Sequence, residues 1–307
     1  MKDTTAHIVE VCPRDGLQNE RRVVATEDKI ALIHRLIAAG ARRIEATGFV
    51  HPGRVPQMAD AEAVLAGIGP HPGVALIGLV LNRRGVERAV ATGALDEVNY
   101  VVPLTDSFGK ANQGQTTAES LAALPVVRSM AADAGLRTTV TVAVAYGCPY
   151  EGDVPVARLR EAVRAIADTG PDEVAVADTI GCAVPADVTS RLRAVREVCA
   201  LPLRTHFHQT RLTALGNVHA AMLEGVTVHD ASAGGIGGCP FAPGAGGNAA
   251  TEDLAWLLHR GGHTTGVDVD AVTRAGRWIC DVLGVPPRSA MAHAGPFPTS
   301  HPPRGPG

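Results

Sequence analysis

Aromatic side chains are scarce in this chain: Phe, Trp and Tyr make up only 3% of its 307 residues. The core must therefore rely on aliphatic side chains, and 46% of the residues are hydrophobic. Parallel strands covered by alanine-rich helices suit this composition better than a β-sandwich does. An excess of basic residues is also lacking, since the formal net charge is −3, and this argues against a nucleic-acid partner.

Long apolar runs are absent as well. No stretch of about 18 uninterrupted apolar residues occurs, so no membrane-spanning helix is expected. The first residues, MKDTT, lead into a strand-like segment without the apolar stretch of a signal peptide, which predicts a cytoplasmic protein. The six cysteines are widely spaced and form no CxxC pair, so we expect reduced thiols rather than disulfides or a zinc knuckle.

One unit recurs along the chain: an alanine-rich amphipathic run ends at a glycine, and a short β-branched run follows. The glycines are Gly40, Gly93, Gly135, Gly170 and Gly225. Because glycine enters the left-handed backbone region without a steric penalty, each is expected to end a helix. Repetition of helix, glycine and strand favours successive βαβ units and a parallel sheet.

Eight strands are predicted, near residues 8–12, 42–47, 74–80, 97–103, 137–144, 173–177, 203–207 and 226–231. Eight strands that alternate with helices predict an α/β fold, a (β/α)₈ TIM barrel. A doubly wound open sheet is the alternative, which periodicity alone leaves open.

The first predicted helix illustrates the pattern of the others. Thr26 is its expected N-cap, and its expected buried stripe consists of Ile30, Ile33, Leu36 and Ile37.

Two further helices are predicted within residues 250–284, packed outside the barrel. Residues 1–284 are therefore taken as one catalytic domain. Residues 285–307 are dominated by Pro and Gly and are predicted to form a disordered tail.

Polar residues gather where the predicted strands end. They are Arg14 and Asp15 after the first strand, Glu45 at the second, Thr105, Asp106 and Lys110 after the fourth, Asp178 and Thr179 after the sixth, and His206 and His208 at the seventh. In a barrel these positions converge on the carboxyl-terminal face, where active sites lie.

The His206-Phe207-His208 sequence is the sharpest local signal. At a strand end both imidazoles can point to one side while Phe207 turns into the wall. Two surface histidines at the start of a loop are the alternative. With Asp15 and Asn248 added, two nitrogen and two oxygen ligands would suit Mg²⁺ or Mn²⁺ better than tetrahedral Zn²⁺.

Residues 234–248, GGIGGCPFAPGAGGN, are rich in glycine. A plain flexible linker is one interpretation; a phosphate-binding loop is less favoured because GxxxxGK[ST] is absent. A mobile loop would expose Cys239 enough to titrate and could deliver it to a substrate.

These residues stand in motifs that resemble the 3-hydroxy-3-methylglutaryl-CoA lyase family. The motifs are IVEVCPRDGLQNE, RRIEATGFVHPGRVPQMAD, AYGCPYEG, VADTIG, HFH and GGIGGCPFAPGAGGNAATEDL, and the resemblance covers about residues 7–284. It implies a metal-dependent carbon–carbon lyase that cleaves 3-hydroxy-3-methylglutaryl-CoA, or a related 3-hydroxy-3-carboxyalkyl-CoA, into acetyl-CoA and a keto acid. It also implies a homodimer and a divalent cation, Mg²⁺ or Mn²⁺.

The resemblance further implies roles for single residues. The metal ligands would be Asp15, His206, His208 and Asn248, and the catalytic residues would be Arg14, Glu45, Asp178 and Cys239. Substrate-binding roles are expected for Gln18, Thr105, Lys110, Asn112, Thr179 and Arg211. Arg211 carries a guanidinium that suits bidentate binding of a substrate carboxylate.

This chain departs from the family pattern at several positions. Gln209 replaces a usual Asp or Asn after HFH, Gly48 stands where Ser is common, and Asp106 replaces a usual Glu. Retained lyase chemistry with an altered acyl group is one outcome. The alternatives are an enzyme that condenses acetyl-CoA with a 2-keto acid, a pyruvate-releasing aldolase, and an inactive barrel that acts as a binding scaffold.

Overall fold

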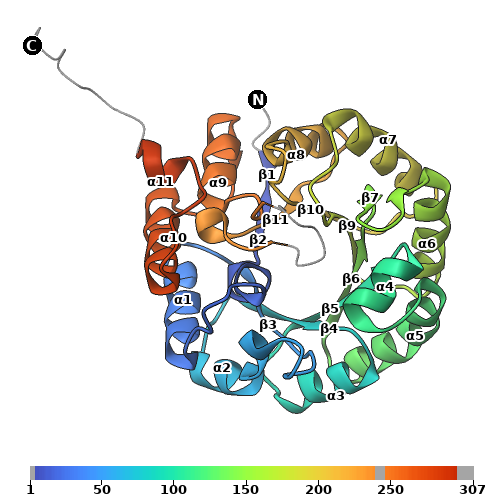
Figure 1. Cartoon of the computed structure of the whole chain (residues 1–307), viewed down its shortest axis with the longest axis horizontal. Coiled ribbons are helices and arrows are strands. Elements are labelled where there is room, and N and C mark those ends of the chain that lie inside the picture. Colours follow the sequence, from blue (N-terminus) through green and yellow to red (C-terminus); the bar gives the residue numbers. More distant parts are fainter. Residues whose placement is uncertain (1–3, 239–245, 296–307) are drawn as a thin grey trace, which may run out of the picture.

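A closed barrel of eight parallel strands forms the centre of the computed structural model, which describes residues 4–238 and 246–295 (Figure 1). The strands are β2 (His7–Glu10), β3 (Arg43–Gly48), β4 (Ala75–Val80), β5 (Glu97–Pro103), β6 (Arg137–Ala143), β9 (Glu173–Asp178), β10 (Leu203–Phe207) and β11 (Val228–Ala231). They follow one another around the barrel in chain order, and β11 pairs with β2 to close it. The predicted TIM barrel is therefore confirmed, and the open sheet is wrong.

Burial on both faces explains why these segments form barrel strands. All seven residues of β5, EVNYVVP, are buried, as are all six of β9, EVAVAD. One face of each strand points into the barrel and the other packs against helices, which is the pattern of parallel sheets.

Helices cover the outside of the barrel as a ring (Figure 1). They are α1 (Thr26–Ala38), α2 (Ala61–Ile68), α3 (Arg83–Ala91), α5 (Thr117–Asp133), α6 (Val156–Asp168), α7 (Pro185–Arg196) and α8 (Ala214–Leu223), with α4 (Asp106–Gln113) added after β5. Each of the five predicted helix-ending glycines has a positive φ, between 59° at Gly93 and 98° at Gly40. The prediction that these glycines end helices in the left-handed region is confirmed.

Helix α1 differs from its prediction in two details. Thr26 is the first helical residue rather than the cap, and its hydroxyl donates to Asp60 Oδ2 at 2.7 Å. The fully buried positions are Lys29, Leu32, Ile33 and Leu36, whereas Ile30 and Ile37 are half-buried. The buried stripe is rotated because the Lys29 ammonium is itself satisfied inside, donating to Asp60 Oδ1 at 2.7 Å.

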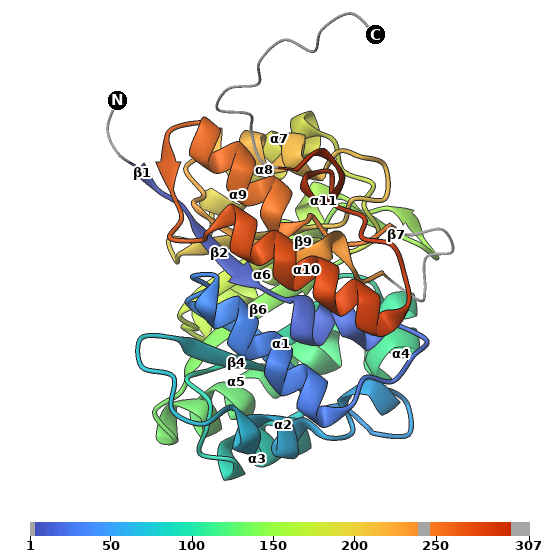
Figure 2. The same cartoon turned by 90° about the vertical axis from the view of Figure 1, so that its left-hand side faces the viewer.

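Two further helices follow the barrel, as predicted: α9 (Thr251–Arg260) and α10 (Val269–Leu283). Figure 2 shows α10 lying beside α1. The guanidinium of Arg35 on α1 lies 4.5 Å from the ring centre of Trp278 on α10, a cation–π contact that joins the two helices.

The chain after α10 packs back onto the domain. A short helix, α11 (Met291–Ala294), is held through Asp253, whose carboxylate accepts from the backbone N–H groups of Ala290 and Met291 at 2.9 and 2.8 Å. Arg288 donates to the carbonyl of Gly237 at 2.8 Å. The packed chain therefore reaches Gly295, beyond the expected boundary at residue 284; the rest of the predicted tail lies outside the described residues.

Small elements complete the fold. They are the parallel pair β1 (Thr4–Thr5) and β12 (His263–Thr264), the hairpin β7 (Gly147–Cys148) and β8 (Gly152–Asp153), and the single turns η1 (Cys12–Gly16), η2 (Pro56–Met58) and η3 (Ala233–Gly235). The cysteines in the described part of the chain, all but Cys239, are free thiols. Across residues 4–238 and 246–295, no helix combines the length and apolar character needed to cross a membrane.

A buried ion network fills the barrel interior. The Arg43 guanidinium donates to both oxygens of Glu97, at 2.9 and 3.0 Å, and to Glu173 Oε1 at 2.9 Å. Thr139 donates its hydroxyl to Glu97 at 2.7 Å. Arg204 is almost fully buried, with its Nε 3.7 Å from Glu173 Oε1. Each buried charge is thus matched by an opposite one.

We predict that Arg43→Ala lowers the free energy of unfolding by about 3–5 kcal/mol, because it removes the hydrogen-bonded partner of two buried carboxylates and leaves only the more distant Arg204 beside both. Urea denaturation measures the change. The matched control is Arg83→Ala, which breaks an exposed pair with Glu87 and should cost less than about 1 kcal/mol. Equal losses in the two variants would contradict the prediction.

Candidate metal centre and pocket

The segment after β2 places two charged side chains at the barrel mouth. Residues Cys12–Gly16 form η1, a single π-helical turn in which the N–H groups of Arg14, Asp15 and Gly16 all point to the carbonyl of Val11, at 2.8–3.2 Å. Such one-turn π elements are frequent at functional sites. Here the turn reverses the chain at once, so Arg14 and Asp15 stay next to the strand end.

Asp15, His206 and His208 form a cluster that can hold a metal ion. One ligand atom from each lies within 4.8 Å of the others. Asp15 Oδ2 is 3.9 Å from His206 Nε2 and 4.0 Å from His208 Nε2. Phe207 between the histidines is buried in the wall, as the alternation of a strand requires.

Asn248 lies beside the cluster. Its Nδ2 donates to Asp15 Oδ2 at 2.8 Å, and residue 248 forms a bridge with His208. Within the described residues its Oδ1 is buried without a hydrogen-bond partner. A carboxylate, two imidazoles and a spare amide oxygen are ligands that fit a divalent cation.

The protonation states also suit metal binding. Burial would raise the pKa of Asp15, but the charges of Arg14 and the two histidines outweigh it and hold that pKa well below its usual value. Burial, followed by repulsion from His206, lowers the pKa of His208 to about 4. An ionised carboxylate and a neutral imidazole are the forms that bind metals.

His206 is oriented by a residue that the sequence interpretation did not include. Its Nδ1 lies 3.1 Å from Asp230 Oδ2 at the end of β11, which leaves Nε2 facing Asp15. Burial lowers the pKa of His206, but the bond to Asp230 and the charge of Asp15 raise it overall. A carboxylate behind a ligating histidine fixes its ring and tautomer.

Arg14 is held between carboxylates. Its Nε donates to Glu45 Oε2 and its Nη1 to Asp15 Oδ1, both at 2.7 Å. Glu45 Oε1 in turn accepts from Asn99 Nδ2 at 2.8 Å, and Asn99 Oδ1 accepts from the Thr141 hydroxyl at 2.8 Å. A continuous polar chain therefore runs across the barrel mouth and fixes the guanidinium of Arg14.

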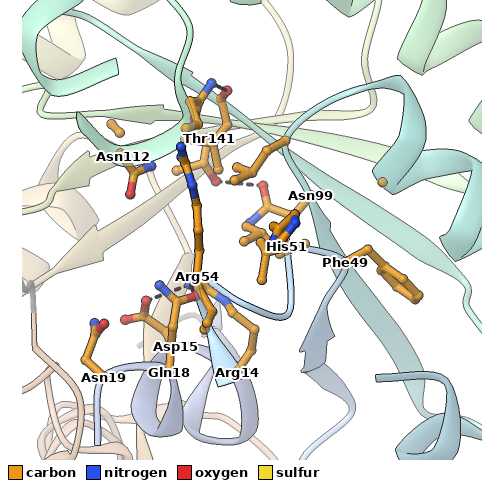
Figure 3. A pocket seen from close by; sticks show the side chains of 18 of the residues that line it. Arg14, Asp15, Gln18, Asn19, Phe49, His51, Arg54, Asn99, Asn112 and Thr141 are labelled. Carbon is orange, nitrogen blue, oxygen red and sulfur yellow. Dashed lines mark hydrogen bonds and ion pairs between the residues drawn. The ribbon is translucent and has the colours of Figure 1, made fainter. Parts of the chain in front are cut away.

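A pocket of about 960 Å³ opens above this cluster (Figure 3). Of the predicted residues it is lined by Arg14, Asp15, Gln18, Asn112, Thr179, His206 and His208. Its other polar lining includes Asn19, His51, Arg54, Asn82, Arg84, Arg88, Asn99, Thr141 and Asp230. The volume is large enough for a ligand far bigger than a metal ion.

Six predicted residues in the described part of the chain do not line the pocket: Glu45 and Asn248 bond to the lining residues Arg14 and Asp15, and four others have different contacts. Asp178 turns to the loop after β9 and accepts from the N–H groups of residues 182 and 183, at 2.9 Å each. Thr105 is buried and donates to Cys148 Sγ, and Lys110 is exposed on α4. Arg211 donates to the carbonyls of residues 180 and 181 and thus braces a loop. Cys239 lies outside the described residues.

Two of the departures in sequence have a structural explanation. Gln209 Oε1 accepts from Ala214 N at 2.9 Å and so caps the start of α8 instead of bonding to the metal cluster. A Cβ at Gly48 would lie 3.6 Å from Arg14 Cγ, an ordinary contact, so this position has room for a side chain beside Arg14. Asp106 Oδ1 accepts from Thr117 N at 2.9 Å, and nothing in the structure explains why Asp stands here in place of Glu.

One of the missed residues, Asp230, has a recognisable signal in the sequence. Asp230 lies next to the last residue of β11, in VTVHDAS, so the rule that polar residues at strand ends face the active site points to it. Asn99 and Thr141 sit within strands and face inward, where alternation alone does not separate barrel lining from outer wall. Arg54 follows β3 in a loop whose direction the sequence does not give, and Arg84 lies in the first turn of α3.

Comparison with known proteins agrees with this geometry. The HMGL-like family model matches residues 5–279. A hydroxymethylglutaryl-CoA lyase of Bacillus subtilis is 42% identical over 280 residues, which are 91% of this chain and 93% of that protein. The mitochondrial enzyme of Mus musculus is 42% identical over 288 residues, 94% of this chain and 88% of that one. The structure of an HMG-CoA lyase from Acinetobacter baumannii, in complex with coenzyme A and 3-methylmalate, is 37% identical, with a TM-score of 0.92 and coverage of 97% of both chains.

We predict that Asp230→Asn weakens Mn²⁺ binding by about 10–100-fold, because an amide holds the His206 ring less firmly in the ligating tautomer. Isothermal titration calorimetry on the metal-free protein measures the affinity. The control is Asp187→Asn on α7, whose carboxylate accepts from the N–H of Val184 and from no other group in the described residues. An Asp230→Asn protein that binds Mn²⁺ as the control does would rule out the orienting role.

Proposed function

Because the chain belongs to the HMGL-like family of carbon–carbon lyases, we propose that it cleaves 3-hydroxy-3-methylglutaryl-CoA, or a related 3-hydroxy-3-carboxyalkyl-CoA, to acetyl-CoA and a keto acid such as acetoacetate. The observation that carries this proposal is the cluster of Asp15, His206 and His208 beside Arg14 in the large pocket. Relatives about 42% identical over most of the chain are hydroxymethylglutaryl-CoA lyases, which supports the substrate.

The metal we propose is Mg²⁺ or Mn²⁺, held by Asp15, His206, His208 and Asn248. When bound, such an ion lowers the pKa of a substrate hydroxyl and polarises a neighbouring carbonyl oxygen. Nitrogen and oxygen ligands without thiolate favour these hard cations.

Residues of the chain would stabilise the negative charge that develops on the enolate during cleavage. The tertiary hydroxyl gives its proton to a base, and the freed electron pair forms the carbonyl of the keto acid at C3. The bond between C2 and C3 breaks, and its electron pair passes into the enolate of acetyl-CoA. Arg14 stays protonated because Glu45 and Asp15 outweigh the effect of its burial and raise its pKa. We assign it to the enolate oxygen, since a fixed cation in a pocket poor in water stabilises developing negative charge. A proton then returns to C2, and we propose Cys239 as its donor.

The wall of the pocket is suited to an anionic substrate. Arg54 and Arg84 line it, and in the described part of the chain neither guanidinium has a hydrogen bond or ion pair. Figure 3 shows the Arg54 side chain extending across the pocket. An acyl-CoA carries a carboxylate at one end and phosphates at the other, and a guanidinium binds either. Arg54 thus takes the anion-binding role that sequence assigned to Arg211.

We also propose a cytoplasmic homodimer. The five free thiols in the described residues fit a reducing compartment. The dimer is proposed from the family resemblance alone.

We expect the purified protein with Mg²⁺ or Mn²⁺ to release acetyl-CoA from 3-hydroxy-3-methylglutaryl-CoA, because the cluster supplies the only assembled metal-ligating group in the described residues. A coupled assay for acetyl-CoA measures the rate. EDTA should abolish it and added metal should restore it.

The alternatives predict other outcomes in the same assay. A condensing enzyme would release free CoA from acetyl-CoA and a 2-keto acid, and an aldolase would release pyruvate from a substrate without CoA. A protein that binds metal but cleaves no ester of a 3-hydroxy-3-carboxyalkyl-CoA panel would be a binding scaffold, and the proposed function would be wrong.

We predict that Arg54→Gln raises the KM for the substrate about tenfold and changes kcat little, because a charge-assisted hydrogen bond to the substrate is lost. Steady-state kinetics of 3-hydroxy-3-methylglutaryl-CoA and of its pantetheine thioester, which lacks the nucleotide phosphates, separate the two anions. A rise with both esters identifies the carboxylate, and a rise with the CoA ester alone identifies the phosphates.

The control for this experiment is Arg83→Gln, an exposed arginine on α3 that does not line the pocket. An Arg54→Gln enzyme with the KM of this control for both esters would remove Arg54 from substrate binding.

A further inference from the structure

Glu10 is a buried carboxyl group that the chemistry above does not use. It lies at the end of β2, is 1% exposed and does not line the pocket. Its Oε1 accepts from the N–H groups of Cys12 at 2.9 Å and Ala233 at 3.1 Å. Its Oε2 accepts from the hydroxyl of Thr251 at 2.8 Å. One side chain therefore joins three segments that are far apart in the sequence.

Those segments carry the oxygen ligands of the candidate metal centre. Cys12 begins η1, which bears Asp15. Thr251 begins α9, three residues after Asn248. Ala233 lies on the other side of the glycine-rich segment, beside Ser232, whose N–H donates to the carbonyl of residue 249 at 2.9 Å. Glu10 thus holds both flanks of that segment against the strand that leads to Asp15.

A second buried carboxylate supports the same arrangement. Both oxygens of Glu252 lie 3.1 Å from the N–H of Gly234, the residue after Ala233. Gly234 has a φ of 74°, and an added Cβ would meet Gly276 O and Cys280 Sγ at 3.0 Å. The turn η3 is therefore confined between α9 and α10. A shift of this turn would break its hydrogen bonds to Glu252.

We propose that Glu10 is a positioning residue for the oxygen half of the metal centre: it fixes the segments of Asp15 and Asn248 relative to each other. His206 lies on β10 and His208 directly follows that strand, and Glu10 forms no described hydrogen bond with either histidine. The inference rests on the metal centre of the proposed function but not on the substrate.

Substitution of Thr251 breaks one of the three hydrogen bonds of Glu10 with the least change in side-chain shape. Thr251→Val keeps the shape of the side chain and removes the bond to Glu10, whereas Thr251→Ser keeps the hydroxyl. Glu10→Gln keeps an oxygen for the two N–H groups and can donate to the Thr251 hydroxyl, whereas Glu10→Ala loses all three bonds. Burial raises the pKa of Glu10 to about 7, so the Thr251 bond persists whichever partner carries the proton.

The test is Mn²⁺ affinity, measured by calorimetry on the metal-free full chain. We expect Thr251→Val and Glu10→Ala to weaken binding about tenfold or more, in the range known for residues behind metal ligands, and the serine and glutamine variants to stay within about twofold. Electron paramagnetic resonance of bound Mn²⁺ should show an altered spectrum in the first two variants only.

Leu159→Ala is the control for general destabilisation. Leu159 is a fully buried residue of α6 with no part in the candidate metal centre, so this variant should lose thermal stability and keep its Mn²⁺ affinity. Wild-type affinity in Thr251→Val, or an equal loss in Leu159→Ala, would overturn the proposal. A wrong substrate assignment would leave these affinities unchanged and appear only in the lyase assay.

Discussion

The structure depends on one electrostatic arrangement: the Asp15 carboxylate is largely buried at the barrel mouth and lies beside a guanidinium and two imidazoles. A buried carboxylate without partners would be costly, and here Arg14, His206, His208 and Asn248 compensate for the lost water. Closure of the barrel makes this possible. Strands β10, β11 and β2 are neighbours, so residues from both ends of the chain meet at one point.

Around that point, the polar side chains are connected rather than independent. From Asp15 the contacts run through Arg14 and Glu45 to Asn99 and Thr141 on one side. On the other side they run from His206 through Asp230 to the Arg204 Nε, 3.3 Å from Asp230 Oδ1. The candidate site and the ion network in the barrel interior are therefore parts of one charge-balanced structure, which links the precision of the site to the stability of the fold.

The fold could be predicted from sequence because glycine-ended helices and apolar strands each have a direct physical signature. The metal cluster could be predicted because alternation puts His206 and His208 on one side of Phe207. The direction in which side chains point at the other strand ends could not be predicted from the sequence. Ala177 lines the pocket, so its neighbour Asp178 must face the opposite way, and a shift of one residue decides which of them meets a ligand. The buried Lys29 shows the same limit for helices, since a hydrophobic pattern does not reveal a satisfied ammonium.

The contact between Arg288 and the carbonyl of Gly237 gives the carboxyl-terminal segment an influence on the catalytic end of the barrel. Gly238, the next residue, lines the pocket, and its carbonyl accepts from Asn19. A chain cut after residue 284, whether to attach a tag or to ease crystallisation, would lack Arg288 and so lose a support of the pocket wall. Comparisons of activity between recombinant versions should therefore use proteins with the same carboxyl terminus.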